Sequence, residues 1–198
     1  MAGNFASAGI FLIQTFFGIY LILVMLRFLM QVSRADYYNP ICQAIVKLTD
    51  PAIKPLRTLL PTVRSIDFAT LTVALIVQLV SVVLIMTIVG SYFFAPIYVA
   101  WSLLGIVSTI LDIYFFALII GVIASWIAPF SHHPALSLVS QITEPICTPA
   151  RKLLPPMGGV DFSIILVFVA ITLIDSYLVI QPIANMLGVP PGLILGLR

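Results

Sequence analysis

Charged residues are scarce in this chain of 198 residues: they make up 8% of it, whereas hydrophobic residues make up 62%. A soluble domain carries about 25% charged residues, so this sequence has too few polar side chains to cover a water-facing surface. The small net charge of +2 and the lack of a long Lys or Arg run argue against nucleic-acid binding. Lipid must cover part of the surface, and we expect an integral membrane protein.

The residue types that support catalysis and metal binding are also few. The sequence has two cysteines and two histidines, no Cys-x-x-Cys pair, no Gly-rich phosphate loop and no Ser, His and Asp set. His132 and His133 are adjacent, which makes a poor metal site. No paired carboxylates suit acid–base chemistry. We therefore expect a non-enzymatic protein without catalytic residues, metal or cofactor.

Four apolar stretches are long enough to cross a bilayer, which takes about 20 mainly apolar residues in a helix. They lie at about Ile10–Met30, Phe68–Val89, Gly105–Ile127 and Phe162–Ile183. The first lacks the basic start of a cleavable signal, so we expect a permanent helix. Residues 91–102 hold Pro96 and five aromatic residues, which is typical of the membrane interface. We interpret them as an interfacial connector; the alternative is that they extend the third helix.

The sequence repeats itself at a constant offset of 94 residues, without a gap. The matched positions are Pro40 and Pro134, Thr49 and Thr143, Asp50 and Glu144, Pro51 and Pro145, Pro55 and Pro149, Arg57 and Arg151, Pro61 and Pro155, and Asp67 and Asp161. We predict an all-α membrane protein made of two two-helix repeats, residues 8–94 and 105–187, with a connector at 95–104 and a tail at 188–198. Each repeat crosses twice, so the two are parallel.

Basic residues concentrate between the two helices of each repeat. The first such segment holds Arg34, Lys47, Lys54, Arg57 and Arg64, and the second holds Arg151 and Lys152. The segment between the repeats and the N-terminal tail hold none. By the positive-inside rule, both basic segments face the cytoplasm and both termini lie on the other side.

Each basic segment begins with a predicted amphipathic helix. Asn39 and Pro40 supply a cap and a first-turn proline, after which apolar residues recur at helical spacing. Because Pro51 and Pro55 lack a backbone donor, we expect the chain to turn at Asp50 and continue as a short broken helix. The second copy repeats the pattern with His133, Pro134, Glu144, Pro145 and Pro149. Such segments belong at the headgroup boundary or against the end of the bundle.

Arg57 and Asp67 lie ten residues apart, and so do Arg151 and Asp161. Each Arg ends a loop helix and each Asp precedes the next span, so we predict an ion pair that links segment and bundle. The basic segments would form a surface for anionic lipid or a partner protein. The alternative is that they only cap the bundle and set its topology.

Asp112 and Asp175 lie within apolar spans, where a charge at the bilayer centre costs about 2.5–3.5 kcal/mol. With Gln14 and Gln78 they are candidates for a proton or cation path. We expect both acids near the outer ends of their helices, within reach of water. Arg27, near the inner end of the first span, is expected to extend its side chain to water.

Two copies of Asn/His-Pro, then Thr-(Asp/Glu)-Pro-x-x-x-Pro-x-Arg-x-Leu-Leu-Pro, then Asp-Phe resemble the YggT family, also called YlmG. The resemblance covers nearly the whole chain and implies a bacterial inner-membrane protein of four helices. Together with the sidedness expected from the basic residues, this puts both termini in the periplasm. Members are linked to osmotic tolerance, to cell-division loci and to plastid membrane organisation and cytochrome b6 haem attachment. The second copy departs from the first, with Gly158-Gly159 in place of Arg64-Ser65, so a charged ligand would favour the first copy.

Two functions fit these features. The first is a non-enzymatic scaffold that organises the membrane or recruits assembly or division proteins through its cytoplasmic segments. The second is a small channel or transporter component in osmotic or ion balance, acting through Asp112 and Asp175. The expected partners are the bilayer and either membrane-associated proteins or further copies of the chain, and not nucleic acid.

Overall fold

The structure is a computed structural model that describes residues 2–63, 65–91, 94–127, 131, 133–154, 161–190 and 192–193. Four helical spans in it are long and apolar enough to cross a membrane. Three are single helices: α1 (Ala2–Val32), α3 (Phe68–Ile88) and α4 (Ile97–Ile127). The fourth is composed of α6 (Ser163–Thr172), the π-helical turn η1 (Leu173–Leu178) and α7 (Ile180–Met186). The predicted fold class is confirmed.

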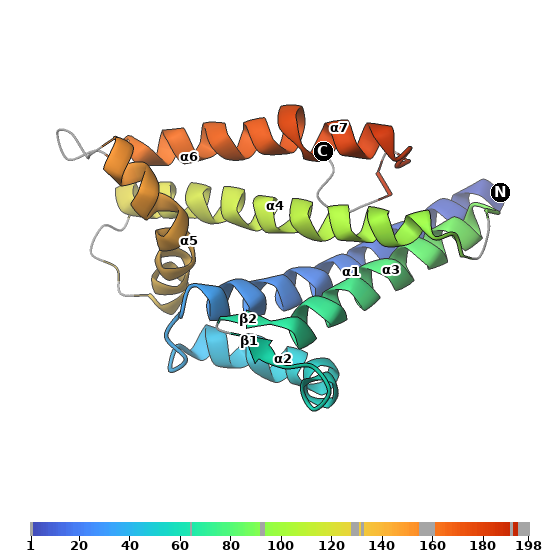
Figure 1. Cartoon of the computed structure of the whole chain (residues 1–198), viewed down its shortest axis with the longest axis horizontal. Coiled ribbons are helices and arrows are strands. Elements are labelled where there is room, and N and C mark those ends of the chain that lie inside the picture. The colour runs from blue at the N-terminus through green and yellow to red at the C-terminus, as the bar shows by residue number, and fades with distance from the viewer. Residues whose placement is uncertain are drawn as a thin grey trace.

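Two amphipathic helices, α2 (Pro40–Arg57) and α5 (Pro134–Leu153), each separate the two spans of a repeat. A short antiparallel hairpin of β1 (Thr62–Val63) and β2 (Ile66–Asp67) follows α2. Both amphipathic helices lie near the end of the bundle where α1 and α4 finish. In Figure 1, α5 is on the left and α2 lies below the left end of α1, whereas α1 begins and α7 ends toward the right. The two repeats therefore run in the same direction.

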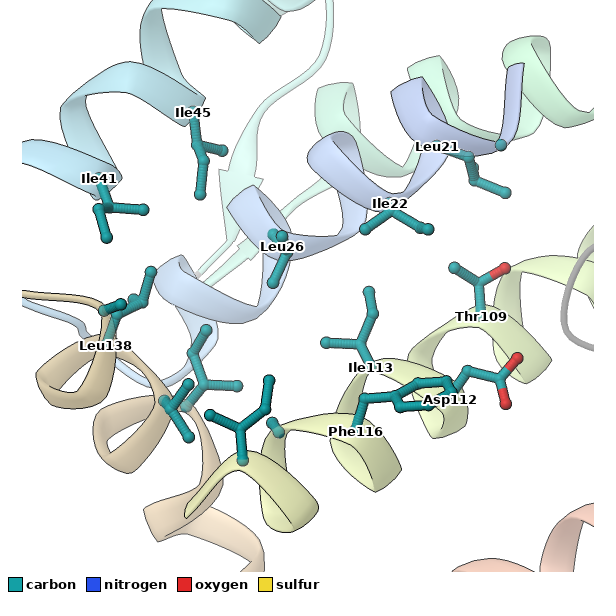
Figure 2. A pocket seen from close by; sticks show the side chains of 16 residues that line it. Leu21, Ile22, Leu26, Ile41, Ile45, Thr109, Asp112, Ile113, Phe116 and Leu138 are labelled. Atoms are coloured by element: carbon teal, nitrogen blue, oxygen red, sulfur yellow. The ribbon is translucent and has the colours of Figure 1, made fainter. Parts of the chain in front are cut away.

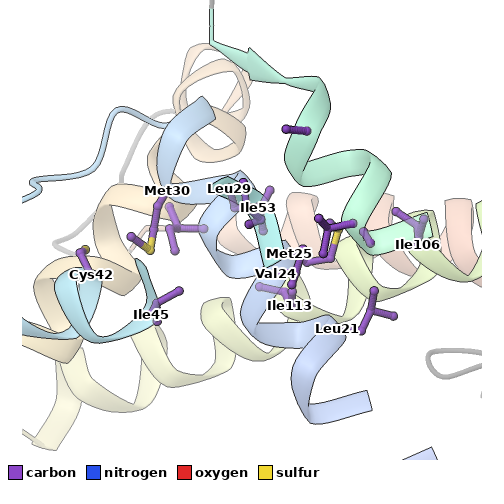
Figure 3. Close-up of a cluster of buried hydrophobic side chains, with 14 of the residues drawn as sticks. Leu21, Val24, Met25, Leu29, Met30, Cys42, Ile45, Ile53, Ile106 and Ile113 are labelled. Carbon is purple, nitrogen blue, oxygen red and sulfur yellow. The ribbon is translucent and has the colours of Figure 1, made fainter. Parts of the chain in front are cut away.

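The core joins the two repeats. Helix α1 packs along α3, and α3 along α4, whereas α6 and α7 pack against α4 (Figure 1). Leu21, Val24 and Met25 of α1 belong to the same buried cluster as Ile53 of α2 and Ile113 of α4 (Figure 3). Large apolar side chains also cover the outside of the spans, among them Phe16, Phe116 and Ile165. This outward apolar surface is what a helix bundle presents to lipid tails.

Helix α4 starts earlier than the proposed connector allows. Residues 97–104 are helical and continuous with the third span, so over these residues the alternative of an extended third helix is correct. Tyr98 and Trp101 are buried within the protein, in one cluster with Val82 and Ile85. The indole Nε1 of Trp101 donates to the carbonyl of Leu187 (3.0 Å), which links α4 to the end of α7. Tyr92 and Phe93 lie outside the described residues.

The internal prolines do not break α2 or α5, contrary to the expected turn at Asp50 and Glu144. Helix α2 continues through Pro51 and Pro55, and α5 continues through its two equivalent prolines. Just before Pro51, the Thr49 hydroxyl donates to the carbonyl of Ile45 (2.7 Å), one turn back. Beyond the proline, Ile53 is fully buried. Tertiary packing therefore holds the helix together where the proline removes a hydrogen bond.

Candidate functional site

The start of each amphipathic helix is fixed by the residue before its proline. Asn39 Oδ1 accepts from the backbone N–H of Ile41 (2.9 Å), and His133 Nδ1 accepts from that of Ala135 (3.2 Å). These are the predicted caps. The Asn39 side chain also donates from Nδ2 to the carbonyl of Pro134 (2.7 Å). Asn39 thus ties the two repeats together at the end where α2 and α5 meet, which the sequence did not indicate.

The end of α2 is held by the predicted ion pair in the first repeat. Arg57 Nε donates to Asp67 Oδ2 (2.9 Å), and Arg57 Nη2 contacts the same oxygen. Asp67 is fully buried and caps α3, accepting from the N–H of Ala69 (3.1 Å) and the hydroxyl of Thr70 (2.9 Å). Burial raises the pKa of this carboxyl, but the hydrogen bonds from Arg57 and Thr70 outweigh burial and leave it below its ordinary value. One carboxylate therefore joins α2 to the start of α3.

The second repeat contains the equivalent pair with one more partner. Arg151 Nε donates to Asp161 Oδ2 (2.9 Å), while its Nη1 lies 2.9 Å from both oxygens of Glu144. Asp161 also accepts from the backbone N–H of Ser163 (3.0 Å). The hydrogen bond from Arg151 is the main cause that lowers the pKa of Glu144. Arg151 is thereby shared between two carboxylates, whereas Arg57 serves one.

Asp50 takes a different partner from its repeat equivalent Glu144. It accepts from Arg27 Nη1 (2.8 Å) of α1 and from Lys54 (2.8 Å) one turn along α2. The hydrogen bond from Lys54 is the largest effect and lowers the pKa of Asp50. Burial, the next largest effect, raises this pKa, and the hydrogen bond from Arg27 lowers it further. Arg27 does not reach out to water as expected: its side chain is 4% exposed, because α2 covers it.

The remaining motif residues divide into an inner and an outer set. Thr49 and Thr143 are buried, and each hydroxyl donates to carbonyls one turn back in its own helix. The motif prolines at the surface are Pro40, Pro51, Pro55, Pro61, Pro145 and Pro149, with Pro134 half-buried. Pro155 lies outside the described residues. The motif therefore builds the fold with its polar members and presents its prolines outward.

Asp112 and Asp175 converge on one small cavity of about 40 Å³, lined also by Phe115 and Ile171. Their expected placement near the outer helix ends is wrong. Asp112 lies at the midpoint of α4, since that helix starts at Ile97, and Asp175 lies near the middle of the fourth span. Asp175 is within the π-helical turn and is 8% exposed. Gln14 and Gln78 are not among the residues that line the cavity.

An apolar groove of about 440 Å³ opens between the repeats (Figure 2). Its wall comes from α1, α2, α4 and α5, and includes Ile22, Ile45, Phe116 and Leu138. Asp112 lines this groove as well as the small cavity. A groove of this composition suits a lipid chain rather than a polar substrate.

The other reactive side chains are enclosed. Cys42 and Cys147 are free and buried, in α2 and α5, and burial raises the pKa of both thiols. High-pKa buried thiols are poor nucleophiles and poor metal ligands. Within the described part of the chain, no three or more His, Cys, Asp or Glu side chains group together as a metal site would require.

Comparison with known proteins finds the same repeat. The family description CCB3/YggT matches residues 6–88 and again residues 100–182. An uncharacterized protein of Pseudomonas aeruginosa is 45% identical over 189 residues, covering 94% of this chain and 95% of that protein. The uncharacterized protein YggT of Escherichia coli (strain K12) is 35% identical over 185 residues, covering 92% of this chain and 95% of that protein. No solved structure matches. The two segments that match the family description, together with these relatives, show that the chain belongs to the CCB3/YggT family.

Proposed function

We propose that this protein is a non-enzymatic scaffold of the bacterial inner membrane, which uses α2 and α5 to recruit a membrane-associated protein. The observation that carries the proposal is that the two repeat-equivalent amphipathic helices meet at one end of the molecule (Figure 1). Residues of the duplicated motif form the contacts that hold these helices there.

Each amphipathic helix is fixed at both ends. The caps at Asn39 and His133 set where the helices begin, and the Arg57 and Arg151 ion pairs set where they end. Fixing a surface before a partner arrives lowers the ordering cost of binding. The helices are therefore preorganised and do not resemble mobile linkers.

The outer surface of this end mixes apolar and basic side chains. Tyr38 is 86% exposed and Leu48 is 59% exposed, with the exposed Lys47 between them in sequence. Exposed aromatic and large apolar residues are typical of protein contact surfaces. The excess of Lys and Arg in the two segments supports a cytoplasmic location, which puts both termini in the periplasm.

Site-specific photo-crosslinking in native membranes tests this function. A photoreactive residue replaces Leu48 or Lys47 on α2, and, as a control, Phe16, an exposed residue of α1 that faces outward along the span. The proposal predicts a discrete protein adduct from the two α2 positions and none from position 16. Adducts with lipid alone from all three positions would contradict recruitment of a protein.

The second candidate function is a proton or cation path, and one observation favours it. Asp112 and Asp175, distant in sequence, line the same cavity midway along their spans. The helix changes to π-helical geometry at Asp175, and such turns occur frequently at functional sites. The cavity has room for about one or two water molecules or a small cation.

Flux into proteoliposomes separates the two functions. A channel predicts proton or cation flux that Asp175→Asn abolishes and that Asp36→Asn, a change in an exposed loop acid, leaves intact. The scaffold predicts flux equal to that of protein-free vesicles, with crosslinking from position 48 unchanged by Asp175→Asn. Flux that is absent while crosslinking persists ends the channel hypothesis.

A further inference from the structure

A second polar cavity lies between the inner end of α1 and the later half of α2. Its volume is about 450 Å³, and its lining includes Arg27, Lys54 and Arg57 together with the polar side chains of Gln31 and Tyr37. Asp50 is the carboxylate that lines it as far as the described residues show. This cavity is therefore rich in cationic donors. We call it the headgroup cavity.

Arg27 is the least expected member of this cavity because it is almost completely buried, with 4% of its side chain exposed. Its hydrogen bonds to Val46 O (3.2 Å), Thr49 Oγ1 (2.8 Å) and Asp50 Oδ1 (2.8 Å) all leave from Nη1. Its Nε is buried and has no hydrogen-bond partner among the described residues. A guanidinium has five N–H donors, so the described residues leave at least the Nε donor of this buried cation unsatisfied.

The charges around Arg27 are not balanced within the protein. Lys54 shares Asp50 with Arg27, and Arg57 is paired with Asp67. Three cations therefore face two carboxylates in the part of the chain that the structure describes. A buried cation that shares its counter-ion leaves an attractive position for an added anion.

The second repeat shows that this excess is not needed to build the fold. The equivalent cavity is about 560 Å³ in volume, with Gly121 at the position of Arg27 and hydroxyls at Ser125 and Ser140. Thr148 replaces Lys54, and Arg151 there faces both Glu144 and Asp161. Among the described residues, Arg151 is the one cation that lines this cavity, and it is paired with two carboxylates that do not line it. The cationic lining is particular to the first repeat.

We infer that the headgroup cavity binds the phosphate group of an anionic phospholipid. Arg and Lys donors arranged around a pocket recognise phosphate through charge-assisted hydrogen bonds. The cavity lies where the apolar span of α1 ends, which is the depth of lipid headgroups, and this favours a lipid phosphate over free phosphate. The inference adds a ligand to the proposed function and rests on it only for the placement of α2 at the membrane surface.

Native mass spectrometry of the full chain in detergent provides the test. The protein is titrated with phosphatidylglycerol or with the zwitterionic phosphatidylcholine, and again with phosphatidylglycerol in the presence of inorganic phosphate. Lys54→Gln removes a cation from the cavity at a side chain that is 72% exposed, so the variant is expected to fold. Lys47→Gln removes the same charge from the same helix outside the cavity, as a matched control.

We expect preferential binding of phosphatidylglycerol that Lys54→Gln weakens about fivefold and Lys47→Gln leaves unchanged. Displacement of the lipid by inorganic phosphate at comparable concentration would assign the cavity to free phosphate and overturn the lipid assignment. An equal loss of phosphatidylglycerol binding in both variants, or equal binding of the two lipids by the unmodified protein, would overturn the site itself. Crosslinking from Leu48 is measured separately, so failure of the lipid site and failure of protein recruitment are distinguishable.

Discussion

Removing Arg57 is the perturbation for which the structure gives the sharpest expectation. Arg57→Ala leaves the fully buried carboxylate of Asp67 without its charged donor, while the bonds from Ala69 and Thr70 remain. Breaking a fully buried pair by removing one partner costs about 3–5 kcal/mol. The side chain of Arg57 is 40% exposed, so water replaces part of the interaction and we expect about 2 kcal/mol.

The second repeat provides the internal comparison. Asp161 is 24% exposed rather than buried, so Arg151→Ala should cost about 1 kcal/mol. In a protein of this size, each kcal/mol lowers the Tm by about 2–4 °C. The expected decreases are therefore about 4–8 °C for Arg57→Ala and about half of that for Arg151→Ala.

Thermal unfolding of the detergent-solubilised protein, followed by circular dichroism, measures these shifts. Lys152→Ala is the matched control, because Lys152 is an exposed cation beside Arg151 in the last turn of α5. Adding Asp67→Asn to Arg57→Ala should lower the Tm only slightly further, since the two residues of the pair act as a unit. A Tm for Arg57→Ala equal to that of Lys152→Ala would refute the role given to this ion pair.

Three further results follow from the structure. Asn39→Ala removes a helix cap and the bond to Pro134, and should lower stability by about 1–2 kcal/mol, whereas Asn39→Asp should retain the cap; denaturant titration of both variants checks this. The folded-state pKa of Asp67 and of Asp161 lies below the ordinary value of 3.8, so both stabilise the protein above that pH. The Tm should therefore fall as the pH drops below about 4, and Arg57→Ala should make the fall shallower. Maleimide should modify Cys42 only after unfolding; rapid labelling of the folded protein would contradict its burial.

The features that could be predicted from the sequence are those fixed by local composition. The four spans follow from apolar runs of bilayer length, which need no knowledge of neighbouring helices. The caps at Asn39 and His133 follow from residues adjacent to the helix start. The ion pair of Arg57 with Asp67 was also predictable, because the duplicated spacing placed an Arg and an Asp at the same two element ends twice.

The features that sequence did not predict depend on packing between distant segments. Arg27 was expected in water, yet α2 folds over it, and only its isolated charge within an apolar span marked it. The prolines of α2 were expected to break the helix, whereas the helix continues through them and buries Ile53 beyond Pro51. The convergence of Asp112 and Asp175 depends on how α4 packs against the fourth span, which no local pattern encodes.

Sided labelling tests most directly the claim that both repeats present α2 and α5 on one side of the membrane. Single cysteines replace Leu48 of α2, Leu153 of α5 and Phe94 between the repeats, all exposed, in a variant without Cys42 and Cys147. A membrane-impermeant maleimide added to intact cells should label position 94 alone. Positions 48 and 153 should react only after permeabilisation. Labelling of 48 and 153 from opposite sides would contradict the parallel arrangement of the two repeats.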